Sequence, residues 1–273
     1  MTREKLSSLS AYDERFYGGE LREIFKCKDF DWCRCRLCGH YQYIANLDEQ
    51  KITRMYTAHT SIKLETRPSS FEDLPTRKRD VIDAVFRKLK ASVPSGASLL
   101  DYGSGFGLWS DVAASHGFNV TSFEPHGDRN KSNVPIQTSW EHVKSKKFDV
   151  IICNQVLEHV VDPRSMVARL AYVSRPGALL YCTVPNAGRH TQSSLEQSWP
   201  FDGRKSHILA PFQHLNGFSQ KSLHMLLAQF GFKPMLRHNV DISVRGLYWL
   251  LAHVTRGVIP LISTTRGTFI FSE

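Results

Sequence analysis

Leu99-Leu-Asp-Tyr-Gly-Ser-Gly-Phe-Gly107 joins a short apolar run to a helical pattern, and the architecture follows from this stretch. Ser98–Tyr102 is expected to form a strand and Leu108–His116 a helix. The three glycines permit a tight turn and let the backbone approach a ligand closely, because no Cβ intervenes. A glycine-rich turn between a strand and a helix is typical of proteins that bind nucleotide-like ligands, and alone it names no particular one.

Short apolar runs alternate with helical patterns on both sides of this turn. This alternation predicts an α/β fold in which helices cover both faces of a parallel sheet. The runs are apolar throughout, as is typical of strands that are buried on both faces. The remaining expected strands are Asn119–Phe123, Phe148–Cys153, Ala178–Val184, Phe232–His238 and Gly267–Ser272, and the remaining expected helices are Arg77–Leu89, Met166–Val173 and Leu223–Phe230.

Two acidic residues lie close to the glycine turn in the sequence, at positions where they could contact its ligand. Asp101 precedes the first glycine, and Glu124 ends the next strand, where a carboxylate could accept both hydroxyls of a ribose. Ligands of open α/β sheets bind beyond the carboxyl ends of the strands, and both residues lie there. A carboxylate at the end of an apolar strand also needs a polar partner. A ligand-binding role is therefore favoured for Glu124.

Four segments in chain order resemble the successive motifs of class I S-adenosylmethionine-dependent methyltransferases. They are LLDYGSGFG, SFEP, FDVIICNQVLEHVVDP and RPGALLYCTVPN, and HLNGFSQKSLHMLLAQFGF continues the resemblance. The branch they resemble includes ubiquinone-biosynthesis O-methyltransferases and bacterial sugar and natural-product methyltransferases. The resemblance covers about residues 77–238. It implies S-adenosylmethionine as cofactor and a Rossmann-like sheet that is mostly parallel, with an antiparallel last strand.

The resemblance also implies a cofactor site. The turn at 103–105 would cradle the methionine part, and Glu124 would bind the ribose. Pro125 would pack near the adenine, and the Trp140 indole would offer a stacking surface there or serve as a core aromatic instead. The pair 154–155 would line the cleft near the transferred methyl group. The full expected set is Asp101, Gly103, Ser104, Gly105, Glu124, Pro125, Trp140, Asn154 and Gln155.

Histidines are the natural candidates for acid–base work. Methyl transfer is an in-line displacement, and a hydroxyl acceptor benefits from a base whose pKa is near neutral. His159 and His214 are the expected catalytic residues. In the ubiquinone-type branch an acidic residue joins the Glu-His pair in holding a divalent metal, and that acid is missing here. Three roles stay open for Glu158–His159: a hydrogen-bonding pair at a helix start, a catalytic base, or metal ligands.

Four cysteines crowd into twelve residues near the N-terminus: Cys27, Cys33, Cys35 and Cys38. Cys35-Arg-Leu-Cys38-Gly39 is a turn in which two thiolates can hold one zinc ion. FDWCRCRLCGHYQY resembles the second half of a small zinc module that precedes some sugar and natural-product methyltransferases. This resemblance implies one structural zinc, with His40 and His59 as substitute ligands. The irregular spacing leaves a degenerate module, which keeps only its packing role, as the alternative.

Composition and charge set the remaining expectations. The 273 residues are expected to form a cysteine-rich module over 1–66 and a methyltransferase domain over 67–273, with an inserted acceptor-side segment at about 186–218. No run approaches the roughly 20 apolar residues of a membrane span, and the polar N-terminus is no secretory signal. A cytoplasmic protein is expected. The net charge is +9, of which +5 falls in 186–273, and this favours an anionic acceptor.

The apolar segment Gly246–Ile259 carries a helical stripe from Leu247 to Val258, with Arg245 and Arg256 beside it. It would dock on the sheet as an amphipathic helix, or its outer face would extend the acceptor site or rest on a membrane surface. The function expected overall is O-methylation of a small molecule or glycan. The alternatives are an RNA methyltransferase, disfavoured by the Val-Leu-Glu-His motif, and a cofactor-binding regulator without activity.

Overall fold

The computed structural model describes residues 32–43, 70–126, 132–190, 213–234 and 258–264, together with 11–15, 17, 19, 50, 53, 197, 201–202, 205–206 and 208–209. The chain divides into two compact units. The smaller contains residues 1–67, 158–161 and 185–222, and the larger contains residues 68–157, 162–184 and 223–273. The expected domain boundary between residues 66 and 67 remains a prediction, because the smaller unit combines N-terminal residues with two later segments.

The larger unit is built on a seven-stranded sheet with the order β11-β12-β7-β6-β3-β4-β5. The strands from β7 to β5 are parallel, whereas β11 and β12 pair antiparallel. This confirms the expected α/β sheet. The strand bounds are β3 Ser98–Tyr102, β4 Asn119–Phe123, β5 Ile136–Gln137, β6 Phe148–Asn154, β7 Ser174–Pro185, β11 Lys233–Pro234 and β12 Val258–Thr264.

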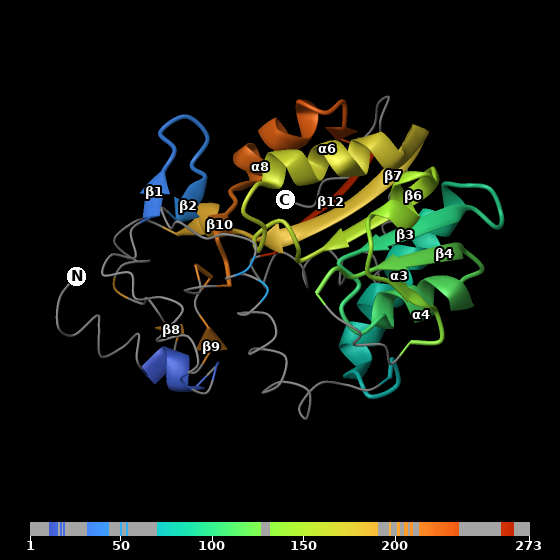
Figure 1. The fold of residues 1–273 in the computed structure, drawn as a ribbon, viewed down its shortest axis with the longest axis horizontal. Coiled ribbons are helices and arrows are strands. Elements are labelled where there is room, and N and C mark those ends of the chain that lie inside the picture. Colours follow the sequence, from blue (N-terminus) through green and yellow to red (C-terminus); the bar gives the residue numbers. More distant parts are fainter. Residues whose placement is uncertain are drawn as a thin grey trace. The chain divides into compact units, whose positions relative to one another are not determined.

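Helices cover both faces of this sheet. Figure 1 shows α3 (Thr76–Ala91) and α4 (Leu108–Ser115) on one side and α6 (Pro163–Val173) on the other. In α3 the apolar residues recur at helical spacing, so Ile82, Val85, Phe86 and Leu89 are all buried. They pack in one cluster with side chains of β3, β6 and β7. Fully burying a side chain of this kind stabilises the fold by about 1.5–3 kcal/mol.

Helix α6 begins at an unambiguous signal. The Asp162 carboxylate accepts hydrogen bonds from the backbone N–H groups of Arg164 and Ser165, at 2.9 and 3.1 Å. Pro163 occupies the first helical position, where its missing N–H costs nothing. Asp162 therefore caps the helix. Glu158 and His159 do not have the helix-start role that the sequence left open for them.

The smaller unit contains a three-stranded antiparallel sheet in the order β1-β2-β10. Its strands are β1 Trp32–Arg34, β2 Tyr41–Tyr43 and β10 Asn216–Gly217. Its core gathers four buried side chains: Tyr41, Tyr43, Ala187 and Leu209. The unit also holds a 3₁₀ turn, η1, at Ala187–Arg189 and a two-stranded sheet of β8 (Phe201–Asp202) and β9 (Lys205–Ser206).

The larger unit differs from the sequence-based elements in several places. The two-residue strand β5 and the short helix α5 (Glu141–Lys144) were not predicted, because segments this short carry no periodicity. Strand β11 covers only part of the expected Phe232–His238. The expected helical stripe is wrong at its end, since Val258 and Ile259 lie in strand β12, where β-branched side chains are favoured.

Several sequence expectations lie outside the described residues. They concern Cys27, His59, the apolar segment as far as Gly257 and the strand expected at Gly267–Ser272. Helix α8 (Gln220–Ala228) is described, and it begins three residues before the expected Leu223. Within the described part of the chain, no helix combines the length and apolar character that crossing a membrane requires.

Candidate functional site

The glycine turn after β3 is fastened to the end of β4. The backbone N–H groups of Gly103 and Ser104 donate to the Phe123 carbonyl, at 2.8 and 3.1 Å. The N–H of Gly105 donates to Glu124 Oε2 at 3.0 Å. Glu124 is only 8% exposed. The structure thus brings the expected loop residues and the expected ribose-binding carboxylate together at the carboxyl edge of the parallel sheet.

The three glycines of this turn have different surroundings. All three have positive φ, which L side chains rarely adopt. A Cβ on Gly103 would lie 2.5 Å from Val156 Cγ2, and one on Gly107 would lie 2.3 Å from Ser132 Cβ, so both positions are closed by packing. A Cβ on Gly105 would meet nothing within 4 Å. Beside this open position lies Ser104, whose buried hydroxyl has no hydrogen-bond partner among the described residues.

These features fit the polar groups of S-adenosylmethionine. Gly105 leaves room for close approach, the Ser104 hydroxyl can pair with a ligand, and the Glu124 carboxylate can accept two hydroxyl hydrogen bonds. Buried hydroxyls and carboxylates are otherwise costly unless they have polar partners. The turn can therefore hold the methionine and ribose parts of the cofactor.

Asp101 lies beneath the turn and not at its surface. It is 2% exposed, and its Oδ2 accepts a hydrogen bond from Ser110 Oγ on α4 at 2.7 Å. Burial raises the pKa of Asp101 to about 7. The carboxyl group thus joins β3 to α4 and supports the turn from below.

We expect Asp101 to make stability depend on pH. Its folded pKa is about 7 against a reference value of 3.8, so the native state holds a proton that the unfolded chain releases between these values. Stability conferred by that proton is present at low pH and is lost as pH rises towards 7, on the order of 1.4 kcal/mol per pKa unit. Asp101→Asn should remove this slope while keeping an acceptor for Ser110. Urea unfolding of both proteins at about pH 5 and about pH 8 measures this slope. An equal change in the free energy of unfolding between the two pH values in both proteins would contradict the prediction.

Asn154 and Gln155, at the end of β6, share a partner that the sequence did not reveal. Thr183 Oγ1 donates to Asn154 Oδ1 at 2.5 Å and accepts from Gln155 Nε2 at 3.1 Å. Gln155 has φ 57° and is the one non-glycine residue with positive φ among the described residues. Such strain costs about 1–3 kcal/mol and gathers at functional sites. Thr183, buried on β7, thus fixes both amides at the carboxyl edge.

Pro125 and Trp140, both expected near the adenine, differ in their exposure to solvent. Pro125 is exposed, whereas Trp140 is half-buried. The indole meets the rings of Tyr102 and Phe123 edge-on, at centroid distances of 5.9 and 5.7 Å, and the Arg169 guanidinium lies 5.8 Å from its centroid. Trp140 therefore packs over the ends of β3 and β4, and its stacking on adenine remains a prediction.

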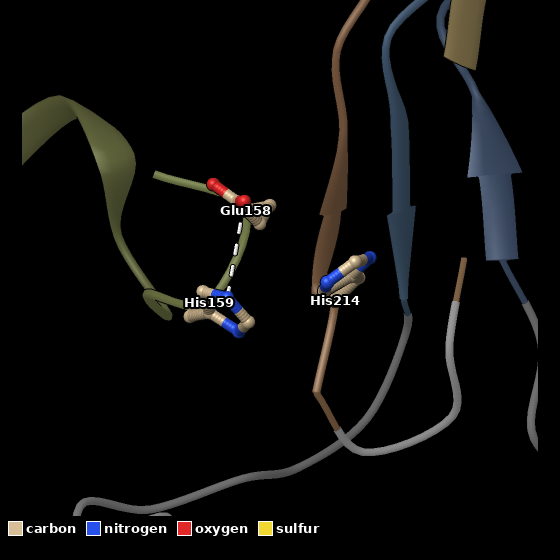
Figure 2. A group of neighbouring side chains, drawn as sticks. All are labelled: Glu158, His159 and His214. Carbon is tan, nitrogen blue, oxygen red and sulfur yellow. Dashed lines mark ion pairs between the residues drawn. The ribbon is translucent and has the colours of Figure 1, made fainter. Parts of the chain in front are cut away.

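Glu158, His159 and His214 form a cluster within the smaller unit (Figure 2). His159 Nδ1 lies 2.8 Å from the Gln213 carbonyl, and His214 Nδ1 lies 2.6 Å from the Ile208 carbonyl. A carbonyl only accepts hydrogen bonds, so Nδ1 carries the proton in both neutral rings and Nε2 presents a lone pair. The rings meet edge-to-face, with centroids 4.9 Å apart.

Glu158 adds a buried carboxylate to the two imidazoles. It is 1% exposed, and neither oxygen accepts a hydrogen bond from a described residue. His159 Nε2 lies 3.8 Å from its Oε1. Burial raises the pKa of Glu158 to about 8. A carboxyl group in this setting needs a proton or a nearby cation.

The cluster fits a divalent metal ion. The ligand atoms of its three members lie within 4.8 Å of one another, and within the described residues no other group of three or more such side chains meets this condition. Two imidazole nitrogens and a carboxylate suit transition metals, and backbone carbonyls fix both ring tautomers. The motif around Glu158–His159 lacks a third ligand in the sequence. His214, 55 residues further along the chain, offers a third ligand atom.

The cysteine hairpin between β1 and β2 has the turn expected of a zinc knuckle. Gly39 N–H donates to the Cys35 carbonyl at 2.9 Å, and Gly39 has φ 72°. The Cys38 backbone N–H lowers the pKa of the Cys35 thiol, whereas burial raises the pKa of Cys38. Cys33 and Cys35 are exposed, and Cys33, Cys35 and Cys38 do not converge as one group of three. The zinc site of four cysteines remains a prediction, and Cys27 lies outside the described residues.

Comparisons with known proteins identify the family of this chain. A family model described as a methyltransferase domain matches residues 72–236, more than half of the chain. Ubiquinone biosynthesis O-methyltransferases are among the relatives. That of Coxiella burnetii (strain Dugway) is 29% identical over 142 residues, covering 46% of this chain and 61% of that protein. That of Hahella chejuensis is 28% identical over 158 residues, covering 52% and 64%. The chain spans less than two thirds of these relatives' length.

Solved structures show the same fold. A 1,6-didemethyltoxoflavin-N1-methyltransferase from Burkholderia thailandensis, with 1,6-didemethyltoxoflavin and S-adenosylhomocysteine bound, aligns with a TM-score of 0.50 at 17% identity, over 86% of this chain and 97% of that one. The fold is that of the class I S-adenosylmethionine-dependent methyltransferases. The chain belongs to the methyltransferase-domain family.

Proposed function

We propose that this protein transfers the methyl group of S-adenosylmethionine to a hydroxyl oxygen of a small molecule or glycan. The observation that carries the oxygen assignment is the cluster of Glu158, His159 and His214, because its imidazoles and carboxylate can accept or hold a hydroxyl proton. The relatives named as O-methyltransferases support it. The basic excess of residues 186–273 favours an anionic acceptor.

The cofactor-binding residues and the cluster of Glu158, His159 and His214 have separate roles. In the larger unit, Glu124 and the turn at 103–105 bind and orient the cofactor, while the Asn154 and Gln155 amides line the edge near the methyl group. In the smaller unit, the cluster orients the acceptor hydroxyl and favours loss of its proton. Glu158 is only three residues beyond Gln155, so the chain itself connects the two. Positioning can supply much of the rate of such an in-line displacement.

We further propose that Glu158, His159 and His214 hold a divalent cation. Such an ion would lower the pKa of a bound hydroxyl and so favour the alkoxide nucleophile. The buried Glu158 carboxylate, which accepts no hydrogen bond from a described residue, supports this assignment, because a cation would balance its charge. A structural zinc at the cysteine hairpin, with Cys35 and Cys38 as two of its ligands, is a separate proposal that the turn geometry supports.

Metal analysis of wild-type and variant proteins tests the cluster. Protein purified without chelator should lose one bound divalent ion per chain on changing His214→Asn, and Cys35→Ser should leave that ion in place. A chelator should abolish methyl transfer, and adding the metal back should restore it. Full activity in metal-free protein would contradict the cation and leave His159 or His214 as a general base.

Gly105 provides a sharp test of the cofactor site. We expect Gly105→Ala to weaken S-adenosylhomocysteine binding at least tenfold, about 1.4 kcal/mol, because its Cβ would enter the open space beside the turn. Gly96→Ala is the matched control, since Gly96 has a similar φ of 71° and a Cβ there would also meet nothing within 4 Å. Both variants should lose similar stability in thermal unfolding. Calorimetric titration showing equal affinity in both would place the ligand elsewhere.

A further inference from the structure

Asn216 holds the backbone on both sides of His159. It is 2% exposed and lies in β10. Its Nδ2 donates to the Val160 carbonyl at 2.6 Å, and its backbone N–H donates to the Glu158 carbonyl at 3.0 Å. These two carbonyls flank His159. The backbone on both sides of His159 is therefore held in place, and hydrogen bonds of this kind are costly to break when they are buried.

His40 sets the orientation of the Asn216 amide. Because Nδ2 is committed to Val160, the Oδ1 atom faces His40, whose Nε2 lies 3.3 Å away. An amide oxygen only accepts, so Nε2 of His40 carries the proton. The ring also packs against Phe218, with centroids 4.7 Å apart.

His40 belongs to the cysteine hairpin, which is anchored next to β10. Ser219 Oγ donates to the Cys38 carbonyl at 2.6 Å, and Lys221 Nζ donates to the Leu37 carbonyl at 2.7 Å. Strand β2 follows directly after His40 and pairs with β10. The position of His40 is therefore fixed by the hairpin and by the segment that contains Asn216.

We propose that Asn216 and His40 are positioning residues for His159. The hairpin places His40, His40 orients the Asn216 amide, and Asn216 fixes the backbone around His159 so that its Nε2 points into the cluster. This inference rests on the proposed function, in which His159 acts on the acceptor hydroxyl. It also gives the cysteine hairpin a part in methyl transfer through the histidine that it carries.

The first test is kinetic. Asn216→Ala should lower kcat roughly 10–100-fold, as removal of a residue that orients a functional histidine does, without changing S-adenosylmethionine affinity. His40→Phe should lower kcat as well, because it keeps the contact with Phe218 and removes the donor. His40→Gln should retain most activity, because its amide can donate near the position of Nε2. Asn119→Ala is the control, since this exposed asparagine begins β4, at the edge of the sheet opposite the glycine turn.

The second test needs no activity. In ¹⁵N spectra of the histidine rings, recorded on protein stripped of divalent metal, wild-type His159 should appear as the Nδ1-protonated tautomer, and Asn216→Ala should convert it to a tautomer mixture while Asn119→Ala should not. An unchanged His159 signal in Asn216→Ala, or a kcat equal to that of Asn119→Ala, would overturn the inference. If the wild-type protein methylates no acceptor, the proposed function fails, and the spectra still decide on the positioning role.

Discussion

Glu124→Ala should lower the affinity for S-adenosylmethionine at least about 100-fold. Two hydrogen bonds from ribose hydroxyls to a buried carboxylate contribute about 1.5–3 kcal/mol each, and every 1.4 kcal/mol is tenfold in affinity. Glu124 also holds the turn, because its oxygens accept the N–H groups of Gly105 and His126 at 3.0 and 3.1 Å. Calorimetric titration with S-adenosylhomocysteine measures the loss.

Two variants make this result interpretable. Glu141→Ala removes an exposed carboxylate from the same unit and should leave the affinity unchanged. Glu124→Gln keeps an oxygen acceptor and removes the charge, so its affinity should lie between those of the wild type and Glu124→Ala. If Glu124→Ala binds as tightly as Glu141→Ala, the ribose is held by other residues and the cofactor site is assigned wrongly.

His159→Asn and His214→Asn should each lower kcat/KM for the acceptor by about 100-fold or more, the usual contribution of a proton-transfer group. Asparagine can place its amide N–H near the position of Nδ1 and so keep the bond to the Gln213 or Ile208 carbonyl, while the Nε2 atom is lost. The loss should therefore reflect chemistry and not folding. Steady-state kinetics at saturating cofactor measure it.

The matched control is His142→Asn, which changes an exposed histidine on α5. Its kcat/KM and its cofactor affinity should equal those of the wild type. The cofactor affinity of the two cluster variants should also be unchanged, because their residues lie outside the glycine turn. Wild-type rates in both cluster variants would remove this cluster from the reaction.

The larger unit was largely predictable from the sequence. Its parallel strands are continuous apolar runs, so β3 and β4 were predicted with the bounds that the structure has. The glycine turn and Glu124 were equally visible, because only certain residue types suit the edge of such a sheet. The role of Thr183 was not predictable, because the sequence of an apolar strand does not show that a threonine hydroxyl within it bonds to two amides.

The smaller unit was not predictable in the same way. Strands of two or three residues show no alternation, and the sheet of β1, β2 and β10 joins segments far apart in the chain. For the same reason His159 and His214 were separate candidates, and the absence of a nearby acid argued against a metal. Only the fold brings His214 to Glu158 and His159, and Asn216 to the carbonyls beside them.

The most direct test of the central claim is transfer of a labelled methyl group from S-adenosylmethionine. Nucleotide sugars, lipid-linked glycans, phenols and RNA should be offered separately, and the methylated atom identified in any product. The account predicts an O-methyl product on a hydroxylated small molecule or glycan, absent with Glu124→Ala and with His214→Asn. Label found only in RNA, or tight S-adenosylhomocysteine binding with no labelled product from any acceptor, would contradict it.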